Sequence, residues 1–252
     1  MIFGQRDSAV RFGWGPREAA ELVSADGCLV VVDVLSFTTA VTIAVERGSA
    51  VYPYRWRDDS AAAYAARIDA VLAVGRAAVT ETHPWSLSPA ALEAAPVTAR
   101  LVLPSPNGST IAAAAVESGA TVVAGSLRNA SAVGAYLRRS GYGTPARPVV
   151  VVASGERWSD ESLRPCLEDQ LGAGAILDAL GAPRERLSPE AAACLAGYRP
   201  VAADVSDLVT ACGGGRELVE RGFDGDVAAA IAVDRSNVVP VLRAGAFVDA
   251  AD

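Results

Sequence analysis

The segment that decides the fold runs from Cys28 to Gly48 and reads CLVVVDVLSFTTAVTIAVERG. Its first eight residues, 28–35, are apolar and rich in valine apart from one aspartate, and this pattern predicts a buried strand. Residues 38–48 have the composition and spacing of a helix and end in glycine, which commonly terminates helices. The segment therefore predicts a strand followed directly by a helix, the repeating unit of α/β proteins.

The same alternation continues along the chain. Apolar runs predict strands near 49–54, 70–74, 100–103, 120–124 and 148–154, and Ala-rich stretches predict helices near 58–68, 108–118, 129–139 and 167–180. Residues 182–212 are predicted to be helical, 215–222 to form a short helix, 226–248 to contain strands, and 141–148 to form a surface loop. We therefore predict a single domain of residues 1–252 with a three-layer α/β/α fold and a largely parallel or mixed sheet.

Composition excludes several classes of protein. With 252 residues, 51% of them hydrophobic and 20% charged, the chain is not intrinsically disordered. All 22 basic residues are arginine, which excludes chemistry that depends on lysine. The 29 acidic residues give a net charge of −7, which argues against a nucleic-acid partner. His83 is the only histidine, so a mechanism that needs two histidines cannot be assembled in one chain.

The cysteines and the apolar runs bear on the compartment. The four cysteines are far apart and form no C-x-x-C pair, unlike those of a small secreted disulfide scaffold; they are Cys28, Cys166, Cys194 and Cys212. The first residues lack the apolar core of a signal peptide, and no apolar run approaches the roughly 20 residues of a membrane helix. We expect a cytoplasmic protein without a membrane partner, and assembly into a homo-oligomer stays open.

The first polar cluster stands at the end of the predicted strand 28–35. Asp33 interrupts the apolar run, and Ser36, Thr38 and Thr39 follow at the start of the next helix. Ligands of parallel α/β sheets bind where strands end and helices begin, and this set suits a divalent cation or an anion. In the alternative interpretation, Ser36 or Thr38 only caps the helix. We favour a function because burying an unpaired carboxylate is costly.

Two further clusters follow later strands. Asn107, Gly108 and Ser109 precede the predicted helix 108–118, where backbone N–H groups could converge on a phosphate or sulfonate, although Asn-Gly is also a common turn. Glu156 follows the predicted strand 148–154. The acidic pair Glu168 and Asp169 opens the helix 167–180, an arrangement that can hold magnesium or simply favour the helix dipole.

Taken in order, these segments resemble the ComB-type 2-phosphosulfolactate phosphatase family over roughly residues 28 to 248. The resemblance is carried by seven blocks of sequence, which are residues 31–50, WSLSPAAL at 85–92, SPNGSTIAAA at 105–114, VVAGSLRNASAV at 122–133, SGE at 154–156, LEDQLGAGAIL at 167–177 and DVAAAIAVDRSNVVPVL at 226–242. It implies a compact α/β fold and a magnesium-dependent phosphatase that converts 2-phospho-3-sulfolactate to sulfolactate and phosphate.

The resemblance also implies roles for individual residues. Asp33, Glu168 and Asp169 would hold Mg²⁺, and Glu156 would act with Asp33 in catalysis as a general base. The substrate would be bound by hydroxyl, amide, backbone and guanidinium groups of Ser36, Thr38, Thr39, Ser88, Asn107, Gly108, Ser109, Arg76 and Arg128.

The sequence departs from the family pattern at two arginines. Ser36 and Thr110 stand where the family usually has arginine, so the chain resembles a divergent member. Guanidinium groups bind phosphate and sulfonate in a bidentate manner, and their loss weakens recognition of a small, multiply anionic substrate. Arg76, Arg128 or Arg157 could compensate. The alternative function is a degenerate family member that binds a small anion without catalysis.

Overall fold

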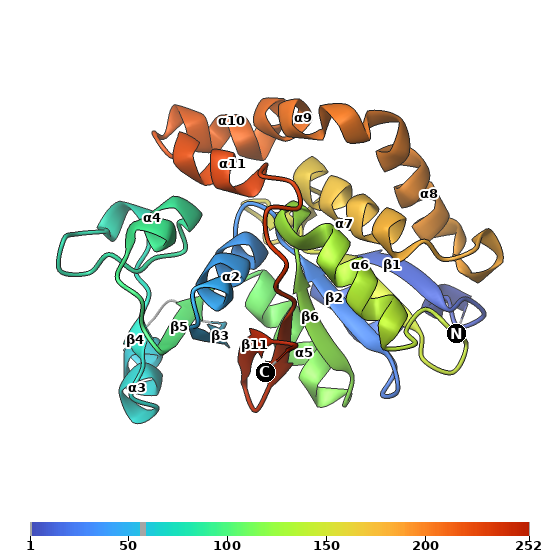
Figure 1. The fold of residues 1–252 in the computed structure, drawn as a ribbon, viewed down its shortest axis with the longest axis horizontal. Coiled ribbons are helices and arrows are strands. Elements are labelled where there is room, and N and C mark those ends of the chain that lie inside the picture. Colours follow the sequence, from blue (N-terminus) through green and yellow to red (C-terminus); the bar gives the residue numbers. More distant parts are fainter. Residues whose placement is uncertain (1, 56–58, 252) are drawn as a thin grey trace.

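The computed structural model describes residues 2–55 and 59–251 (Figure 1), and a nine-stranded sheet forms its centre. In chain order the strands of this sheet are β1 (Val10–Trp14), β2 (Cys28–Val32), β3 (Ala50–Tyr54), β4 (Val71–Leu72), β5 (Arg100–Pro104), β6 (Thr121–Gly125), β7 (Val149–Ala153), β10 (Pro240–Arg243) and β11 (Ala246–Asp249). A separate small hairpin consists of β8 (Glu156–Arg157) and β9 (Leu163–Arg164).

The sheet consists of two parallel blocks joined by an antiparallel hairpin. Its order is β1-β7-β2-β6-β10-β11-β3-β5-β4. Strands β1, β7, β2 and β6 are parallel to their neighbours, as are β3, β5 and β4. The hairpin β10–β11 lies between the blocks and pairs antiparallel with both, through Val241 opposite Val123 and Phe247 opposite Val51.

Helices cover both faces of the sheet (Figure 1), which confirms the predicted three-layer α/β/α fold. Helices α6, α7 and α8 pack on one face, and α1, α2 and α5 pack on the other. The helices are α1 (Gly15–Leu22), α2 (Phe37–Glu46), α3 (Asp59–Arg67), α4 (Pro89–Ala94), α5 (Gly108–Glu117), α6 (Ala130–Arg139), α7 (Leu167–Leu180), α8 (Pro189–Tyr198), α9 (Val205–Ala211), α10 (Gly213–Glu220) and α11 (Asp224–Ala230).

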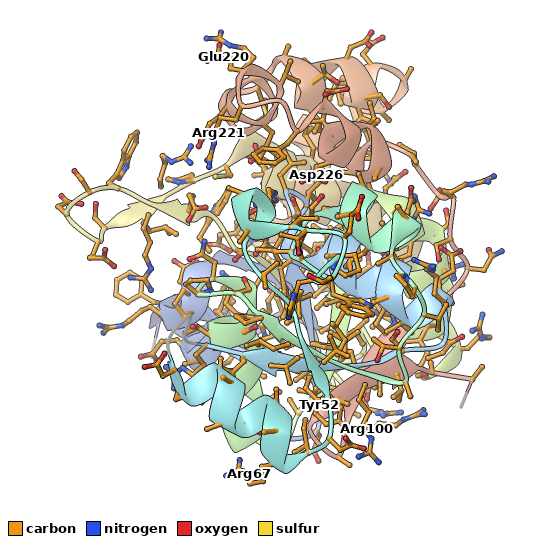
Figure 2. The ribbon with its side chains drawn as sticks, turned by 90° about the vertical axis from the view of Figure 1, so that its left-hand side faces the viewer. Tyr52, Arg67, Arg100, Glu220, Arg221 and Asp226 are labelled. Carbon is orange, nitrogen blue, oxygen red and sulfur yellow. The ribbon has the colours of Figure 1, made fainter. Side chains whose placement is uncertain are left out.

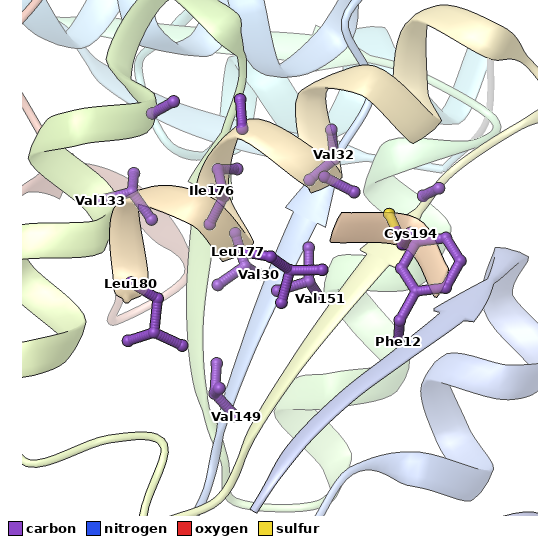
Figure 3. Packing of buried hydrophobic residues seen from close by; sticks show 14 of the residues in the cluster. Phe12, Val30, Val32, Val133, Val149, Val151, Ile176, Leu177, Leu180 and Cys194 are labelled. Carbon is purple, nitrogen blue, oxygen red and sulfur yellow. The ribbon is translucent and has the colours of Figure 1, made fainter. Parts of the chain in front are cut away.

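Strand β2 shows why the segment quoted first decides the fold. Every residue of this strand is buried because successive side chains point to opposite faces and both faces are covered. Val30 and Val32 pack with α6, α7 and α8, where Figure 3 shows them beside Ile176, while Leu29 and Val31 pack with α1, α2 and α5. A strand buried on both faces therefore appears in the sequence as a continuous apolar run.

The structure differs from the sequence predictions in several elements, among them helix α4, which was not predicted. Strand β1 and helix α1 were not predicted, because Gly13 and Gly15 interrupt the pattern in this region. Gly13 is required there, since a Cβ atom at this position would lie 2.6 Å from the Leu22 side chain. The segment 226–248 contains the strands β10 and β11, as predicted, but it begins inside helix α11. The predicted helix 58–68 is observed from Asp59, while residue 58 lies outside the described residues.

No helix in the described part of the chain is long and apolar enough to cross a membrane.

Candidate active site

A cavity of about 720 Å³ lies where parallel strands end. The segments that follow β2, β4, β5 and β7 all contribute to its wall, so strand ends from both parallel blocks meet at the cavity. Three arginines and six carboxylates are among the described lining residues: Arg76, Arg164, Arg221, Asp33, Asp59, Glu156, Glu168, Asp169 and Glu217. The wall therefore has an excess of acidic groups, and a cation is needed before a strongly anionic ligand can enter at low energetic cost.

Asp33 is a buried carboxylate at the end of β2. Its Oδ1 accepts a hydrogen bond from the backbone N–H of Phe37 at 3.1 Å, at the start of α2. Burial raises the pKa of Asp33 to about 6, against the lowering effect of that hydrogen bond; Glu156 raises it further, and Arg76 and the backbone N–H of Gly108 lower it. Asp33 thus has a pKa close to neutral pH, which suits a group that takes part in proton transfer.

Asp169 joins two strand ends beside Asp33. Its Oδ1 accepts from the backbone N–H of Val34 and its Oδ2 from that of Gly155, both at 2.8 Å. Burial raises the pKa of Asp169 well above its ordinary value, and repulsion from Asp33 and Glu168 adds to this effect, although the two backbone donors lower it. Two buried carboxylates therefore repel each other at the base of the cavity, and this repulsion would be relieved by a cation.

Glu168, the third predicted metal ligand, also lines the cavity and is buried. The Cys212 thiol donates a hydrogen bond to its Oε2 at 3.1 Å. The first turn of α10 lies directly against this carboxylate, because a Cβ atom on Gly214 would be only 2.3 Å from Oε1. Gly214 thus allows α10 to approach Glu168 closely and to form one wall of the cavity.

A buried network fixes Arg76 at the cavity. Asp226, which is 1% exposed, accepts from Arg76 Nε at 2.7 Å, from the Ser88 hydroxyl and from the backbone N–H of Ala90. Arg76 Nη2 in turn donates to the Ser36 hydroxyl, which lines the cavity. In Figure 2, Asp226 lies between the C-terminal helices and the segment around α4. Ser88 therefore acts on Arg76 through Asp226 and does not itself line the cavity.

Asn107 and Glu156 meet at the cavity rim. The Asn107 side-chain amide donates to Glu156 Oε1 at 2.5 Å, and both residues line the cavity. Glu156 Oε1 also accepts from the backbone N–H of Arg157 at 3.2 Å. Gly108 lies behind them, packed so closely on Phe37 that any side chain would collide with its ring. Ser109 is buried beside Gly108, and its hydroxyl has no partner among the described residues.

Thr38 and Thr39 were predicted to bind substrate, but their hydroxyl groups serve the backbone. Thr38 Oγ1 donates to the carbonyl of Asp33, and Thr39 Oγ1 donates to that of Val34, each at 2.8 Å. Both side chains are fully buried and neither lines the cavity. The hydroxyl groups of Thr38 and Thr39 therefore stabilise the strand-to-helix turn, while Ser36, the residue at the N-cap of α2, forms no side-chain cap hydrogen bond.

The structure also places Arg128 and Arg157 outside the cavity. Arg128 is buried and forms ion pairs with Glu46 at 3.4 Å and with Glu93 at 3.1 Å. Arg157 is exposed on the β8–β9 hairpin and pairs with Glu161. Their charges are used within the fold, so neither replaces the missing family arginines by lining the cavity.

Sequence reasoning missed three other residues of this site. Arg164 and Arg221 line the cavity, and Asp226 holds Arg76 from 150 positions away in the chain. A partial signal existed for Asp226, because it opens the block 226–242 and the first turn of α11. Arg164 and Arg221 lie in short polar segments without a recognisable motif.

The three predicted metal ligands do not form a preassembled metal site. Within residues 2–55 and 59–251, no group of three or more His, Cys, Asp or Glu side chains is arranged to hold a metal ion. The predicted ligands Asp33, Glu168 and Asp169 line one cavity without forming a closed cage. Mg²⁺ is commonly bound by one or two carboxylates together with water and substrate phosphate, and such a site needs no closed cage.

The fold and the cavity define an α/β protein with a cavity at strand ends, which is where such sheets usually bind small ligands. The chain belongs to the 2-phosphosulpholactate phosphatase family, whose model matches residues 16–245. The family name describes an enzyme that acts on a phosphate monoester, and it confirms the resemblance seen in the sequence. No curated protein gives a significant match to the chain.

Proposed function

We propose that the protein is a magnesium-dependent phosphatase that hydrolyses a small phosphorylated hydroxy acid, with 2-phospho-3-sulfolactate as the substrate named by the family. The observation that carries this proposal is the pair of buried, mutually repelling carboxylates Asp33 and Asp169 beside Arg76 in one cavity. This combination provides a cation site next to an anion site, as phosphoryl transfer requires.

Each nearby group has a chemical role in this proposal. Asp33, with Glu168 or Asp169, would hold Mg²⁺, which supplies polarisation of a phosphoryl oxygen when bound. Arg76 and the Ser36 hydroxyl bind the phosphoryl oxygens, and Asn107 orients Glu156. Glu156 accepts a proton from the attacking water as its oxygen bonds to phosphorus. The phosphorus–oxygen bond to the alcohol then breaks, the alcohol oxygen takes up a proton from water, and Glu156 returns its proton to the solvent.

The test is release of inorganic phosphate from a panel of small phosphorylated hydroxy acids, with Mg²⁺, Mn²⁺ or a chelator. We expect release with the metal, at least a hundredfold loss in Asp33→Asn, and near-normal activity in the control Asp224→Asn, because Asp224 is exposed at the start of α11. Absence of phosphate release from every ester with either metal would rule out the phosphatase.

A second candidate is binding of a small anion without turnover. The contact between Asn107 and Glu156 favours it, because Glu156 Oε1 already accepts from the Asn107 amide and from the Arg157 backbone N–H, and so is less available to an attacking water. This alternative predicts that sulfolactate or phosphate raises the melting temperature while no ester is hydrolysed.

A further inference from the structure

Arg164 is a cavity arginine without an acidic partner among residues 2–55 and 59–251. It lies on β9, and its guanidinium carbon is 5.5 Å from the centre of the Trp158 ring. Among the residues that the structure describes, no carboxylate is within ion-pair distance of it, although the cavity wall is mostly acidic. The aromatic face limits the motion of the guanidinium while leaving its N–H groups available to a ligand.

Arg221 stands on another wall of the same cavity. It follows α10, and Figure 2 shows it on the side from which the β8–β9 hairpin projects. Its partner is Glu217, at 3.2 Å, and the two side chains are 58% and 56% exposed. An exposed pair one helical turn apart contributes little stability. Arg221 can therefore exchange Glu217 for a ligand at small cost.

The guanidinium groups of Arg164 and Arg221 are freer to bind a ligand than that of Arg76. Arg76 is bound by the buried Asp226 and the Ser36 hydroxyl, at the end of the cavity that we assign to phosphate. Arg164 lies on β9, and Arg221 lies at the end of α10. Neither side chain takes part in the described hydrogen bonds of Arg76 and Asp226. A volume of about 720 Å³ also leaves room for much more than a phosphoryl group.

We propose that Arg164 and Arg221 form a second anion subsite, which binds a carboxylate or sulfonate on the carbon chain that carries the phosphate. This inference rests on the proposed function only for the position of the phosphate. Guanidinium groups match both acids, because each offers two or more oxygens to the parallel N–H donors. The subsite selects phosphate esters that carry a further acid group over phosphate esters of the same shape that lack one.

Matched probes separate the two acid groups. Isopropyl phosphate has no second acid. 2-Phospholactate replaces one of its methyl groups by a carboxylate, and 2-(phosphonooxy)propane-1-sulfonate carries a sulfonate instead. Steady-state kcat/KM is measured on all three with magnesium. Binding of 3-sulfolactate, which has no phosphate to lose, is measured by titration calorimetry and gives a readout that does not depend on hydrolysis.

The variants are Arg164→Gln and Arg221→Gln, singly and together. Matched controls are Arg157→Gln on the same hairpin and Arg216→Gln on α10, because both arginines are exposed and neither lines the cavity. Urea unfolding of each variant checks that the fold is retained.

We expect each subsite variant to lose roughly 10- to 100-fold in kcat/KM on at least one acid-bearing ester, and less than about threefold on isopropyl phosphate. The Kd for 3-sulfolactate rises at least about tenfold, and the controls stay near wild type. An equal loss on all three esters, an unchanged Kd, or no binding of 3-sulfolactate by the wild type would overturn the subsite. If wild type hydrolyses nothing but binds 3-sulfolactate through these arginines, the phosphatase proposal fails and the subsite stands.

Discussion

Replacing Asp33 by asparagine tests how much the buried charge of this carboxylate lowers the stability of the folded protein. The pKa of Asp33 is about 6 in the folded protein against 3.8 for a free side chain, mainly because the group is buried. Since the folded protein binds this proton more tightly, its stability falls as pH rises from about 4 to about 6, and the full penalty persists above that. A difference of about two pKa units corresponds to about 3 kcal/mol.

Without metal, Asp33→Asn should therefore be more stable than wild type at pH 8. The amide can still accept from Phe37, but it cannot satisfy both backbone donors equally, which offsets about 1 kcal/mol. The expected net gain is about 2 kcal/mol at pH 8 and close to zero at pH 4.

Urea unfolding at these two pH values, with chelator, measures the effect, and Asp224→Asn serves as the exposed control. Adding Mg²⁺ at a hundredfold excess over its Kd should stabilise wild type by about 2.7 kcal/mol and the variant by much less. A variant that is less stable than wild type at pH 8, or equal stabilisation of both by Mg²⁺, would refute the reasoning.

Two other substitutions test the walls of the cavity. Gly214→Ala places a methyl group against Glu168. We therefore expect the free energy of unfolding in urea to fall by about 1–3 kcal/mol, and Mg²⁺ to bind more weakly. The control Gly213→Ala, whose Cβ would lie in open space, should change the free energy of unfolding by less than about 0.5 kcal/mol. Arg76→Ala should lose at least about tenfold in kcat/KM and recover part of it with millimolar guanidinium. The double variant Arg76→Ala/Asp226→Asn should not respond to guanidinium, because the carboxylate that would hold the cation is gone; equal rescue of both variants would show that Asp226 does not position Arg76.

The layers of the fold could be predicted from sequence because both sides of the parallel strands are buried. Such strands appear as β-branched runs, and the order of strands and helices then follows along the chain. Strand β1 escaped detection because Gly13 leaves space for Leu22, a requirement that only the tertiary structure reveals. Helix α11 was not predicted because the apolar residues of the segment 226–248 were taken to indicate strands.

The site was predictable where a residue follows a strand directly, and not where contacts join distant segments. Asp33, Asn107 and Glu156 were found because each follows a predicted strand, and residues at strand ends commonly bind ligands in α/β proteins. Asp226 acts on Arg76 across 150 positions, and no local pattern encodes that contact. Thr38 and Thr39 follow a strand directly and yet do not line the cavity. Hydroxyl groups at a helix start bind nearby backbone groups as readily as they bind a ligand, and the sequence does not distinguish the two.

The antiparallel hairpin β10–β11 has a consequence for how the chain folds during synthesis. The strands of both parallel blocks are translated before residue 240, yet within the sheet the blocks are connected only through this hairpin in the part of the chain that the structure describes. Helices α2 and α5 contact strands of both blocks and can pack on them on the ribosome, but two open strand edges, β6 and β3, stay exposed until the hairpin emerges. Exposed edges favour pairing with other chains. A ribosome stalled before Pro240 should therefore carry a protease-sensitive, association-prone intermediate, and release of the last strands should convert it into a protected one.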